Sequence, residues 1–396
     1  GDGQTDTTSE PVVTNTYWVA GDFTASVKLT KGTDEVEDGV VLHVVPKIMR
    51  VKGDNKNAAF PYDTVDNAAS NINQALTVAI ADSVIEVEPG TVREPRHVRV
   101  EKRMTIRGRT GHPGDVTVRG NGYGGTLEDD WNFDLANAGA SFESLTLVSP
   151  GTRHIRIDQA GGTVSNCVIR GDAIEEACYN HSDLGVVTHC VFSNITLSVN
   201  GGGGMGLKGV YASDKHGARL SNTLFVKCTA NTSGNSYESR PSGIIDAWGT
   251  VEFCTVANCK MVKSEMPHVL FHNLYEEKSV TPCGKLRACV FGANKIGNEL
   301  GLAIVRCKGA TIENCVGDFA VNGLSRVATT EEIFRRPAKG DWRLRANSPA
   351  RDIVPKSELP ADLPATDLGG NPRVYSVGLD AGCYECQSGG LMLLVR

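Results

Sequence analysis

The sequence lacks the long hydrophobic runs, the basic blocks and the phosphate-loop ending that mark several common classes of protein. No stretch of about 18 apolar residues occurs, so we expect no membrane-spanning helix. The 46 acidic and 40 basic residues are spread along the chain without a basic block, which argues against nucleic-acid binding. The glycine run at 201–204 lacks a Gly-Lys-Ser/Thr ending and is therefore no phosphate loop.

Metal-ligand patterns are also sparse. Cys383 and Cys386 form a lone Cys-x-x-Cys with no second pair and no histidine at finger spacing, which argues against a zinc site. His268 and His272 are four residues apart, but the apolar residues between them are typical of a strand, where such a pair does not share a metal. We therefore expect no cofactor and no metal ion, apart from the calcium considered below.

The sequence does contain a repeat, between residues 142 and 316. In each copy one position, which we call the anchor, is Leu, Cys or Thr, and large apolar residues recur three positions before it and two positions after it. Successive anchors are 22, 23, 33, 31, 35 and 26 residues apart, as expected of a solenoid with loops of variable length. The anchors are Leu145, Cys167, Cys190, Thr223, Cys254, Cys289 and Cys315.

The offsets within the repeat indicate which solenoid it is. Residues on one face of a straight strand are an even number apart, so apolar positions at −3 and +2 require a corner just before the anchor. Asn166, Asn222 and Asn314 precede anchors, and asparagine tolerates the left-handed conformation of a one-residue corner. Glycines five or six residues before the anchors, such as Gly162 and Gly249, indicate a second corner.

These features predict a parallel β-helix in which successive anchors stack at about the 4.8 Å strand spacing. A leucine-rich horseshoe is the alternative, but no Leu-x-x-Leu-x-Leu pattern is present. Because identical side chains stacked in parallel register point the same way, we interpret the anchor cysteines as a ladder of small buried hydrophobes. Cys228 and Cys259 both lie five residues after an anchor on neighbouring repeats, and we expect either a disulfide or a second ladder there.

By composition the chain divides into four parts. Residues 1–12 form a polar, flexible tail, and residues 13–50 form an N-terminal β-strand segment with apolar runs at 16–20, 25–29 and 40–45. Residues 51–326 form the parallel β-helix, with an amphipathic helix near 64–82, capped by Asp63 or Thr64, covering the first coil. Residues 327–396 form an irregular closing region that ends in an apolar strand at 389–396.

Two parts of the chain carry a family resemblance. Residues 60–75 and 84–94 resemble the opening of secreted bacterial right-handed parallel β-helix proteins of the pectate-lyase-like superfamily, which usually have Tyr where this chain has Val92. Residues 347–352, 366–373 and 379–385 are similar to the closing module of the same exported proteins, which often precedes a surface anchor. The resemblance implies an all-β, right-handed parallel β-helix that is secreted, extracellular or on a bacterial cell surface. Gly1 is not a natural start, so we expect either a removed signal or an artificial beginning.

The family that the chain resembles includes enzymes that cleave acidic polysaccharides, so the candidate site residues are those suited to that chemistry. Residues 128–134 cluster four carboxylates beside an aromatic, and Asp129, Asp130, Trp131 and Asp134 could bind calcium or a sugar; an acidic surface loop is the alternative. Lys208 and His216 lie in a long insertion that could border a groove; Lys208 would be the base of a lyase, and a solvated glycine-rich loop is the alternative.

No convergent catalytic site follows from these candidates. Asp129–Asp130, His216–Gly217 and Arg306-Cys-Lys308 follow the order of a polygalacturonase, but about three coils, some ~15 Å, separate each group from the next, too far for one site. We therefore expect no catalytic residue and a non-catalytic extracellular β-helix: an adhesive surface or filament-forming subunit that joins copies of itself head-to-tail or by strand addition. The alternative is a polysaccharide lyase or glycoside hydrolase with a groove along the β-helix.

Overall fold

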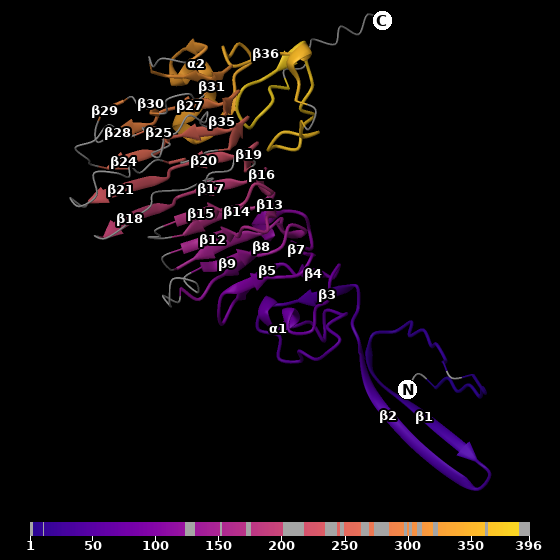
Figure 1. Ribbon diagram of the computed structural model, residues 1–396. Coiled ribbons are helices and arrows are strands. Elements are labelled where there is room, and N and C mark those ends of the chain that lie inside the picture. Colours follow the sequence, from indigo (N-terminus) through magenta and orange to yellow (C-terminus); the bar gives the residue numbers. More distant parts are fainter. Residues whose placement is uncertain are drawn as a thin grey trace, which may run out of the picture.

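The chain winds into coils whose short strands pair in parallel with the corresponding strands of the coils before and after (Figure 1). The computed structural model describes residues 3–10, 12–122, 131–150, 153–171, 176–200, 218–233, 244–245, 249–262, 269–272, 285–296, 299–300, 303–306, 311–319, 324–360 and 363–387. Its long parallel sheets form a right-handed parallel β-helix, so the predicted fold class is confirmed.

Two ten-stranded sheets run the length of the β-helix. Sheet 1 consists of β3 (Ile48–Val51), β4 (Val84–Val87), β7 (Met104–Gly108), β10 (Ala140–Glu143), β13 (Gly162–Ser165), β16 (Gly185–Thr188), β19 (Arg219–Ser221), β22 (Thr250–Glu252), β26 (Lys285–Arg287) and β31 (Thr311–Glu313). Sheet 2 consists of β5 (Gly90–Arg93), β8 (Val116–Arg119), β11 (Thr146–Ser149), β14 (Val168–Gly171), β17 (Val191–Ser193), β20 (Leu224–Val226), β23 (Thr255–Ala257), β27 (Val290–Gly292), β32 (Val316–Gly317) and β33 (Arg326–Val327).

The third side of the β-helix is divided between two main sheets. Sheet 3, in the early coils, contains β6 (Val98–Val100), β9 (Trp131–Leu135), β12 (Arg153–Ile157) and β15 (Glu176–Asn180). Sheet 4, in the later coils, contains β18 (Thr196–Asn200), β21 (Thr229–Ser233), β24 (Lys260–Val262), β28 (Lys295–Ile296) and the antiparallel β29 (Glu299–Leu300). A separate two-stranded parallel sheet consists of β25 (Val269–His272) and β30 (Ala303–Arg306).

The corner predicted before each anchor is present. The residue before the anchor has a left-handed backbone in every repeat, with φ between 46° at Asn222 and 56° at Ser144. The predicted use of glycine at the second corner is correct at Gly162, where φ is 148°, but Gly249 has no positive φ. Gly249 is required for another reason: an added Cβ would lie 1.9 Å from the carbonyl oxygen of Ala218.

The anchors follow one another along the interior of the β-helix. All seven are buried. The carbonyl oxygen of one anchor accepts a hydrogen bond from the amide of the residue that follows the next anchor, as Cys167 does from Val191 at 2.8 Å. The thiol of each anchor cysteine donates to the carbonyl oxygen two residues earlier, as Cys254 does to Glu252 at 3.3 Å. A second corner column joins sheets 2 and 4, and its interior residues are Ile195, Cys228, Cys259 and Asn294.

The helix at the N-terminal end is much shorter than predicted. Helix α1 spans Ile72–Leu76, not residues 64–82, and its N-cap is Asn71, whose side chain accepts from the Gln74 amide. The preceding segment is held extended because Ala69 bridges to Val51 of β3, and Asp63 and Thr64 instead hydrogen-bond Asn67 in a turn. Ile72 and Ala75 nevertheless pack into the core of the first coils, so α1 covers that end as expected.

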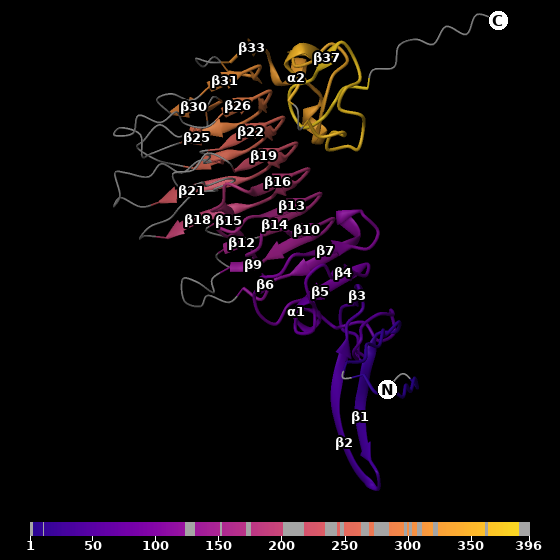
Figure 2. The same ribbon diagram turned by 45° about the vertical axis from the view of Figure 1, so that its right-hand side comes forward.

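A β-hairpin precedes the β-helix. Strands β1 (Gly21–Lys31) and β2 (Asp34–Val44) pair antiparallel with each other and belong to no other sheet. Figures 1 and 2 show the hairpin extending away from the N-terminal end of the β-helix, at the opposite end from the C-terminal region. Residues 16–20, predicted as a strand, have no strand structure.

The C-terminal region folds against the outer face of sheet 2 near the last coils (Figure 2). Its apolar residues, Phe334, Trp342 and Leu379 among them, pack on Leu224 and Val290 of sheet 2. Its short elements are α2 (Thr330–Ile333), β34 (Phe334–Arg336), β35 (Asp341–Leu344), β36 (Val354–Pro355) and β37 (Gly378–Leu379), with 3-10 turns η3 (Pro337–Lys339) and η4 (Lys356–Glu358); a further turn, η1 (Pro113–Asp115), lies in an early coil. The expected terminal strand at 389–396 lies outside the described residues. No helix in the described part of the chain is long and apolar enough to cross a membrane.

Candidate functional site

The residues predicted to bind a ligand fall in two places. Asp129, Asp130, Lys208 and His216 lie outside the described residues, and so do most residues of the insertions at 121–135 and 200–219, the expected groove walls of an enzyme. Trp131 and Asp134 both lie on β9, in sheet 3. The candidate site that the structure describes is therefore the outer face of sheet 3.

Charged side chains line up across this face because the strand register puts equivalent positions side by side. Asp134 of β9 is paired in register with Arg99 of β6 and with Arg156 of β12, and Arg156 is paired with Tyr179 of β15. We call Arg99, Asp134, Arg156 and Tyr179 the sheet 3 row. Their neighbours along each strand, such as Val98 and Ile155, are buried in the core, so the row faces outward.

Asp134 holds the two arginines of the row in place. Its side chain is 1% exposed. Arg156 donates to both carboxylate oxygens, from Nε at 3.0 Å and from Nη2 at 2.7 Å, and Arg99 also donates to Oδ2. A calcium ion at Asp134 would have to displace both guanidinium groups, so this carboxylate is better suited to positioning arginines than to holding a metal.

Both arginines remain firmly charged. The hydrogen bond to Asp134 is the main reason that the pKa of Arg156 is raised. Burial works against the charge of Arg99, but hydrogen bonds to Glu101 and Asp134 outweigh it and raise the Arg99 pKa as well. Arg99 also lies 3.7 Å from Asp158, measured from Nη2 to Oδ2. With side chains 34% and 17% exposed, Arg99 and Arg156 can meet a ligand from solvent.

Aromatic rings border the row. Trp131 stacks on Tyr179 with ring centroids 5.6 Å apart, and Tyr179 lies 5.4 Å from His181. The Arg153 guanidinium lies 5.6 Å from the centroid of the Trp131 ring. Trp131 is only 5% exposed, whereas Tyr179 and His181 are partly exposed. Trp131 therefore supports the ring of Tyr179 from beneath, and the rings of Tyr179 and His181 are the ones that solvent can reach.

One histidine on β12 does not belong to the accessible face. His154 is fully buried, and its ring lies edge-on to Phe133 with centroids 5.7 Å apart. Neither ring nitrogen has a hydrogen-bond partner among the described residues. Burial lowers the pKa of His154 to about 3, so the ring is neutral at ordinary pH and is out of reach of a substrate.

The buried cysteines that the structure describes are unsuited to nucleophilic chemistry. Cys228 and Cys259 are free, buried thiols, so the structure contains the second column of side chains rather than the disulfide. Burial raises the pKa of the Cys167 and Cys259 thiols, which disfavours the reactive thiolate. No group of three or more His, Cys, Asp or Glu residues that could hold a metal occurs within the described segments, and Cys383 is buried.

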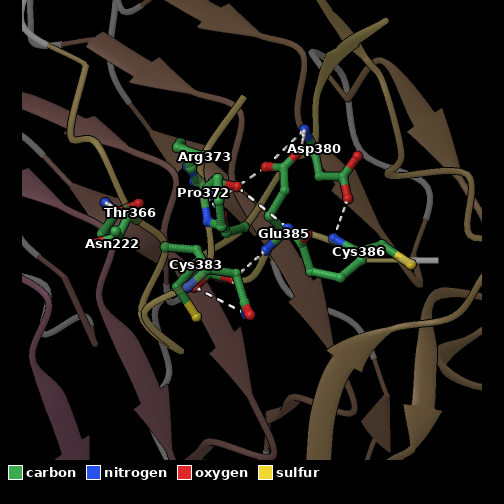
Figure 3. Close-up of polar contacts among 12 residues, drawn as sticks. Asn222, Thr366, Pro372, Arg373, Asp380, Cys383, Glu385 and Cys386 are labelled. Atoms are coloured by element: carbon green, nitrogen blue, oxygen red, sulfur yellow. Dashed lines mark hydrogen bonds and ion pairs between the residues drawn. The ribbon is translucent and has the colours of Figure 1, made fainter. Parts of the chain in front are cut away.

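A second polar cluster lies in the C-terminal region (Figure 3). Arg373 is fully buried, donates from Nη2 to the Gly382 carbonyl at 2.6 Å and lies 4.5 Å from the centroid of Phe253 in the β-helix. Its Nη1 is 3.5 Å from Glu385. Burial, followed by repulsion from Asp380, raises the pKa of Glu385 to about 8.

This cluster attaches the closing region to the β-helix. Figure 3 shows Thr366 beside Asn222, whose side chain donates to the Thr366 carbonyl at 3.1 Å. His189, the corresponding corner residue one coil earlier, lies 2.9 Å from the same carbonyl oxygen. Thr255 accepts from the Cys383 amide at 3.0 Å. Because Arg373, Asn222, His189 and Thr255 each bond to another part of the chain itself, the cluster is best understood as structural.

The sequence analysis named Trp131 and Asp134 as candidates but did not name Arg99, Arg156 or Tyr179. A signal for them exists: each occupies the middle of a three-residue segment whose flanking residues point inward, the segments being 98–100, 155–157 and 178–180. That signal becomes visible only once the strands of sheet 3 are aligned with one another. The anchors provide no alignment here, because the segments between anchors and sheet 3 vary in length.

No family model matches the sequence, and no curated protein matches it. Solved structures match its fold. The structure of pectate lyase Pel9A is similar with a TM-score of 0.50 and 11% identity, covering 86% of this chain and 96% of that chain. Pectin methylesterase PemA from Erwinia chrysanthemi (TM-score 0.36, 9% identity, 75% and 98% coverage) and a pectin methylesterase from Aspergillus niger (0.33, 15%, 70% and 86%) are more distant. At such identities the likeness to Pel9A shows the fold alone: this chain is a right-handed parallel β-helix.

Proposed function

We propose that this protein is a non-catalytic extracellular β-helix, an adhesive or structural subunit that binds an acidic polysaccharide along the outer face of sheet 3. The observation that carries the proposal is the sheet 3 row, in which Asp134 fixes two arginines beside the partly exposed Tyr179. Arginine binds carboxylates in a bidentate manner, and aromatic rings offer an apolar surface to a sugar. The four strands extend about 14 Å, which favours a polymer over a single sugar.

The same contacts support binding without cleavage. A lyase needs a base that is unprotonated when it meets the substrate. The raised pKa values of Arg99 and Arg156 keep both side chains protonated. An inverting hydrolase needs two accessible carboxylates about 6.5–9.5 Å apart, and Asp134 is buried under two guanidinium groups. Glu101 and Asp158 are exposed enough for a ligand carboxylate to replace them beside Arg99.

Binding assays with polymers of differing charge test this proposal. We expect the protein to bind polygalacturonate or alginate and not a neutral glucan, with affinity falling as salt rises. Arg156→Gln should weaken binding about tenfold, equivalent to about 1.4 kcal/mol. Lys285→Gln is the matched control, because Lys285 is a partly exposed cation on sheet 1 that pairs with Glu313. Equal affinity for charged and neutral polymers, or equal loss in the two variants, would contradict the proposal.

Polysaccharide cleavage is the second candidate, favoured by the fold shared with pectate lyase Pel9A. Its test is the appearance of unsaturated or reducing ends from the same polymers, with and without added Ca²⁺. Here Lys208 and His216 are the residues to replace, since Lys208 is the candidate base. Cleavage abolished by Lys208→Ala but retained by Arg156→Gln would replace the non-catalytic proposal with a lyase whose site lies in the 201–217 segment.

A further inference from the structure

The N-terminal hairpin is amphipathic, with one apolar face. Pairing of Phe23 with Leu42, Ala25 with Val40 and Leu29 with Val36 puts these six side chains on one face. The opposite face carries mostly polar side chains, with Val41 as its one large apolar residue: Asp22, Thr24, Ser26, Lys28, Thr30, Glu35, Glu37, Val41 and His43. A hairpin with one apolar and one polar face is the pattern of a sheet that packs on another layer.

Nothing described in this chain covers the outer half of the apolar face. Val27 is 60% exposed, and Leu29 and Val36 are each 67% exposed. At the base of the hairpin the polar face meets the β-helix, where His43 lies 6.2 Å from Phe60 between ring centroids. The apolar face is turned away from that contact, because Leu42 and His43 are successive residues of one strand.

We propose that a second copy of this chain covers the apolar face, with the two hairpins packed face to face about a two-fold axis parallel to their strands. This inference deepens the subunit role proposed above and does not depend on polysaccharide binding. An isolated two-stranded hairpin is marginally stable in water, whereas two stacked hairpins bury their apolar side chains between layers about 10 Å apart.

Side-chain pairing favours this arrangement. A two-fold axis between the faces places β1 of each copy opposite β2 of the other, so residues paired within one hairpin also oppose each other between hairpins. Leu29 then packs on Val36 of the second copy. Lys31 at the tip faces Asp34 of the second copy, which gives two symmetric pairs of opposite charge. Asp38 then faces Val27 of the second copy, so no charged residue directly opposes one of its own sign.

The apolar face is nearly free of charge, which disfavours a partner that binds by charge. Asp38, opposite Val27, is the one charged residue among the paired positions between Gly21–Val44 and Leu29–Val36 on this face. Eleven residues of strand extend about 36 Å, and two strands are about 10 Å wide, so the whole face covers about 360 Å², of which the inner half is already partly covered, Phe23 lying 4.8 Å from Tyr17 between ring centroids. Apolar patches of that size mark interaction sites, although the area is below that of a standard interface, so we expect a reversible dimer.

Sedimentation of the full chain from about 1 to about 100 µM tests the inference. The wild-type protein should form dimers, and Leu29→Lys should raise the dimer dissociation constant at least about tenfold. Asp38→Val should lower the dimer dissociation constant, because the replacement removes the charge from the apolar face. Thr30→Lys is the matched control, because Thr30 follows Leu29 in β1 and lies on the polar face. This substitution should leave the dimer dissociation constant unchanged. Thermal melts should show an intact β-helix in all three variants, since the hairpin forms a sheet of its own.

Each outcome decides the matter. A monomer throughout this concentration range overturns the inference. A dimer that Leu29→Lys leaves intact also overturns it, because the contact then lies elsewhere, for example at a free strand edge. Polysaccharide binding by the Leu29→Lys monomer separates the two proposals: retained binding with lost dimers supports both, whereas absent binding with wild-type dimers contradicts only the polysaccharide proposal.

Discussion

Arg156 on β12 donates to both carboxylate oxygens of Asp134 on the neighbouring strand, from Nε at 3.0 Å and from Nη2 at 2.7 Å. The carboxylate is buried, whereas the arginine is partly exposed. The pair therefore fixes a cation at the surface by means of an anion beneath it. This arrangement makes Asp134 a positioning residue for Arg99 and Arg156 rather than a ligand-binding group in its own right.

We expect Asp134→Asn to lower the free energy of unfolding by about 1–3 kcal/mol, because hydrogen bonds to charged groups are lost within a buried site. The variant should also weaken polysaccharide binding, although Asp134 does not face solvent. Urea unfolding measures the first effect. Asp158→Asn is the control: Asp158 is 31% exposed and 3.7 Å from Arg99, so its loss should cost less than about 1 kcal/mol. Equal costs would contradict the positioning role.

The buried His154 predicts a loss of stability in acid. Its pKa is lowered from 6.5 to about 3, so between these values the unfolded chain binds a proton that the folded chain does not. Stability attributable to this group is present above about pH 6.5 and falls by about 1.4 kcal/mol per pH unit as the pH decreases towards 3. His154→Phe should remove this slope in urea titrations at several pH values, whereas replacing the exposed His112 with Gln should retain it.

Glu385 predicts the opposite pH dependence in the C-terminal region. Its pKa is raised from 4.5 to about 8, chiefly by burial, so the folded chain holds a proton that the unfolded chain has released. The stability is present below about pH 4.5 and is lost as the pH rises through about 8. Glu385→Gln should therefore be more stable than the wild type at pH 9 by about 1–3 kcal/mol and nearly equal to it at pH 4.5. Proteolysis of the closing region at the two pH values measures this; greater sensitivity of the variant at pH 9 would contradict it.

One corner is occupied by a residue that is poorly suited to its left-handed backbone, so we predict that a substitution there is stabilising. Ala293 has φ of 56° at the corner between sheets 2 and 4, where Asn194 and Asn258 occupy the corners of other coils. A left-handed backbone costs a residue with a Cβ about 1 kcal/mol, so Ala293→Gly should raise the melting temperature by a few degrees. Ala257→Gly is the control: Ala257 lies in β23 with no positive φ, and glycine should destabilise it. A fall in both melting temperatures would contradict the assignment of strain to the corner.

The sequence predicted the corners where asparagine marks them, because Asn166, Asn222 and Asn314 carry a conformational preference that can be read without coordinates. At Phe253 and Ala288 the backbone is equally left-handed with no such residue, since the stacking of neighbouring coils imposes it. Those two corners could be located only from the period of the repeat. The local signal was sufficient in three repeats, and tertiary context determined the others.

Other features depended on contacts that sequence spacing does not encode. The apolar period at 68–80 is compatible with a long helix, but the bridge from Ala69 to Val51 competes for the first half of that segment. The buried pair of Arg373 and Glu385 joins residues that look like ordinary surface charges in the sequence. The sheet 3 row required the register of four strands, which only the folded chain supplies.

The two corner columns have a consequence for what the molecule tolerates. In the repeats with anchors, from Leu145 to Cys315, the connection between sheets 1 and 2 is one left-handed residue and one anchor, and the connection between sheets 2 and 4 is equally short. From β17 onward, the difference in coil length therefore lies between the end of each sheet 4 strand and the start of the next sheet 1 strand. A peptide inserted directly after a sheet 4 strand, away from the buried Ile244 and Ile245, should leave both corner columns intact, which makes these coils a scaffold for foreign loops.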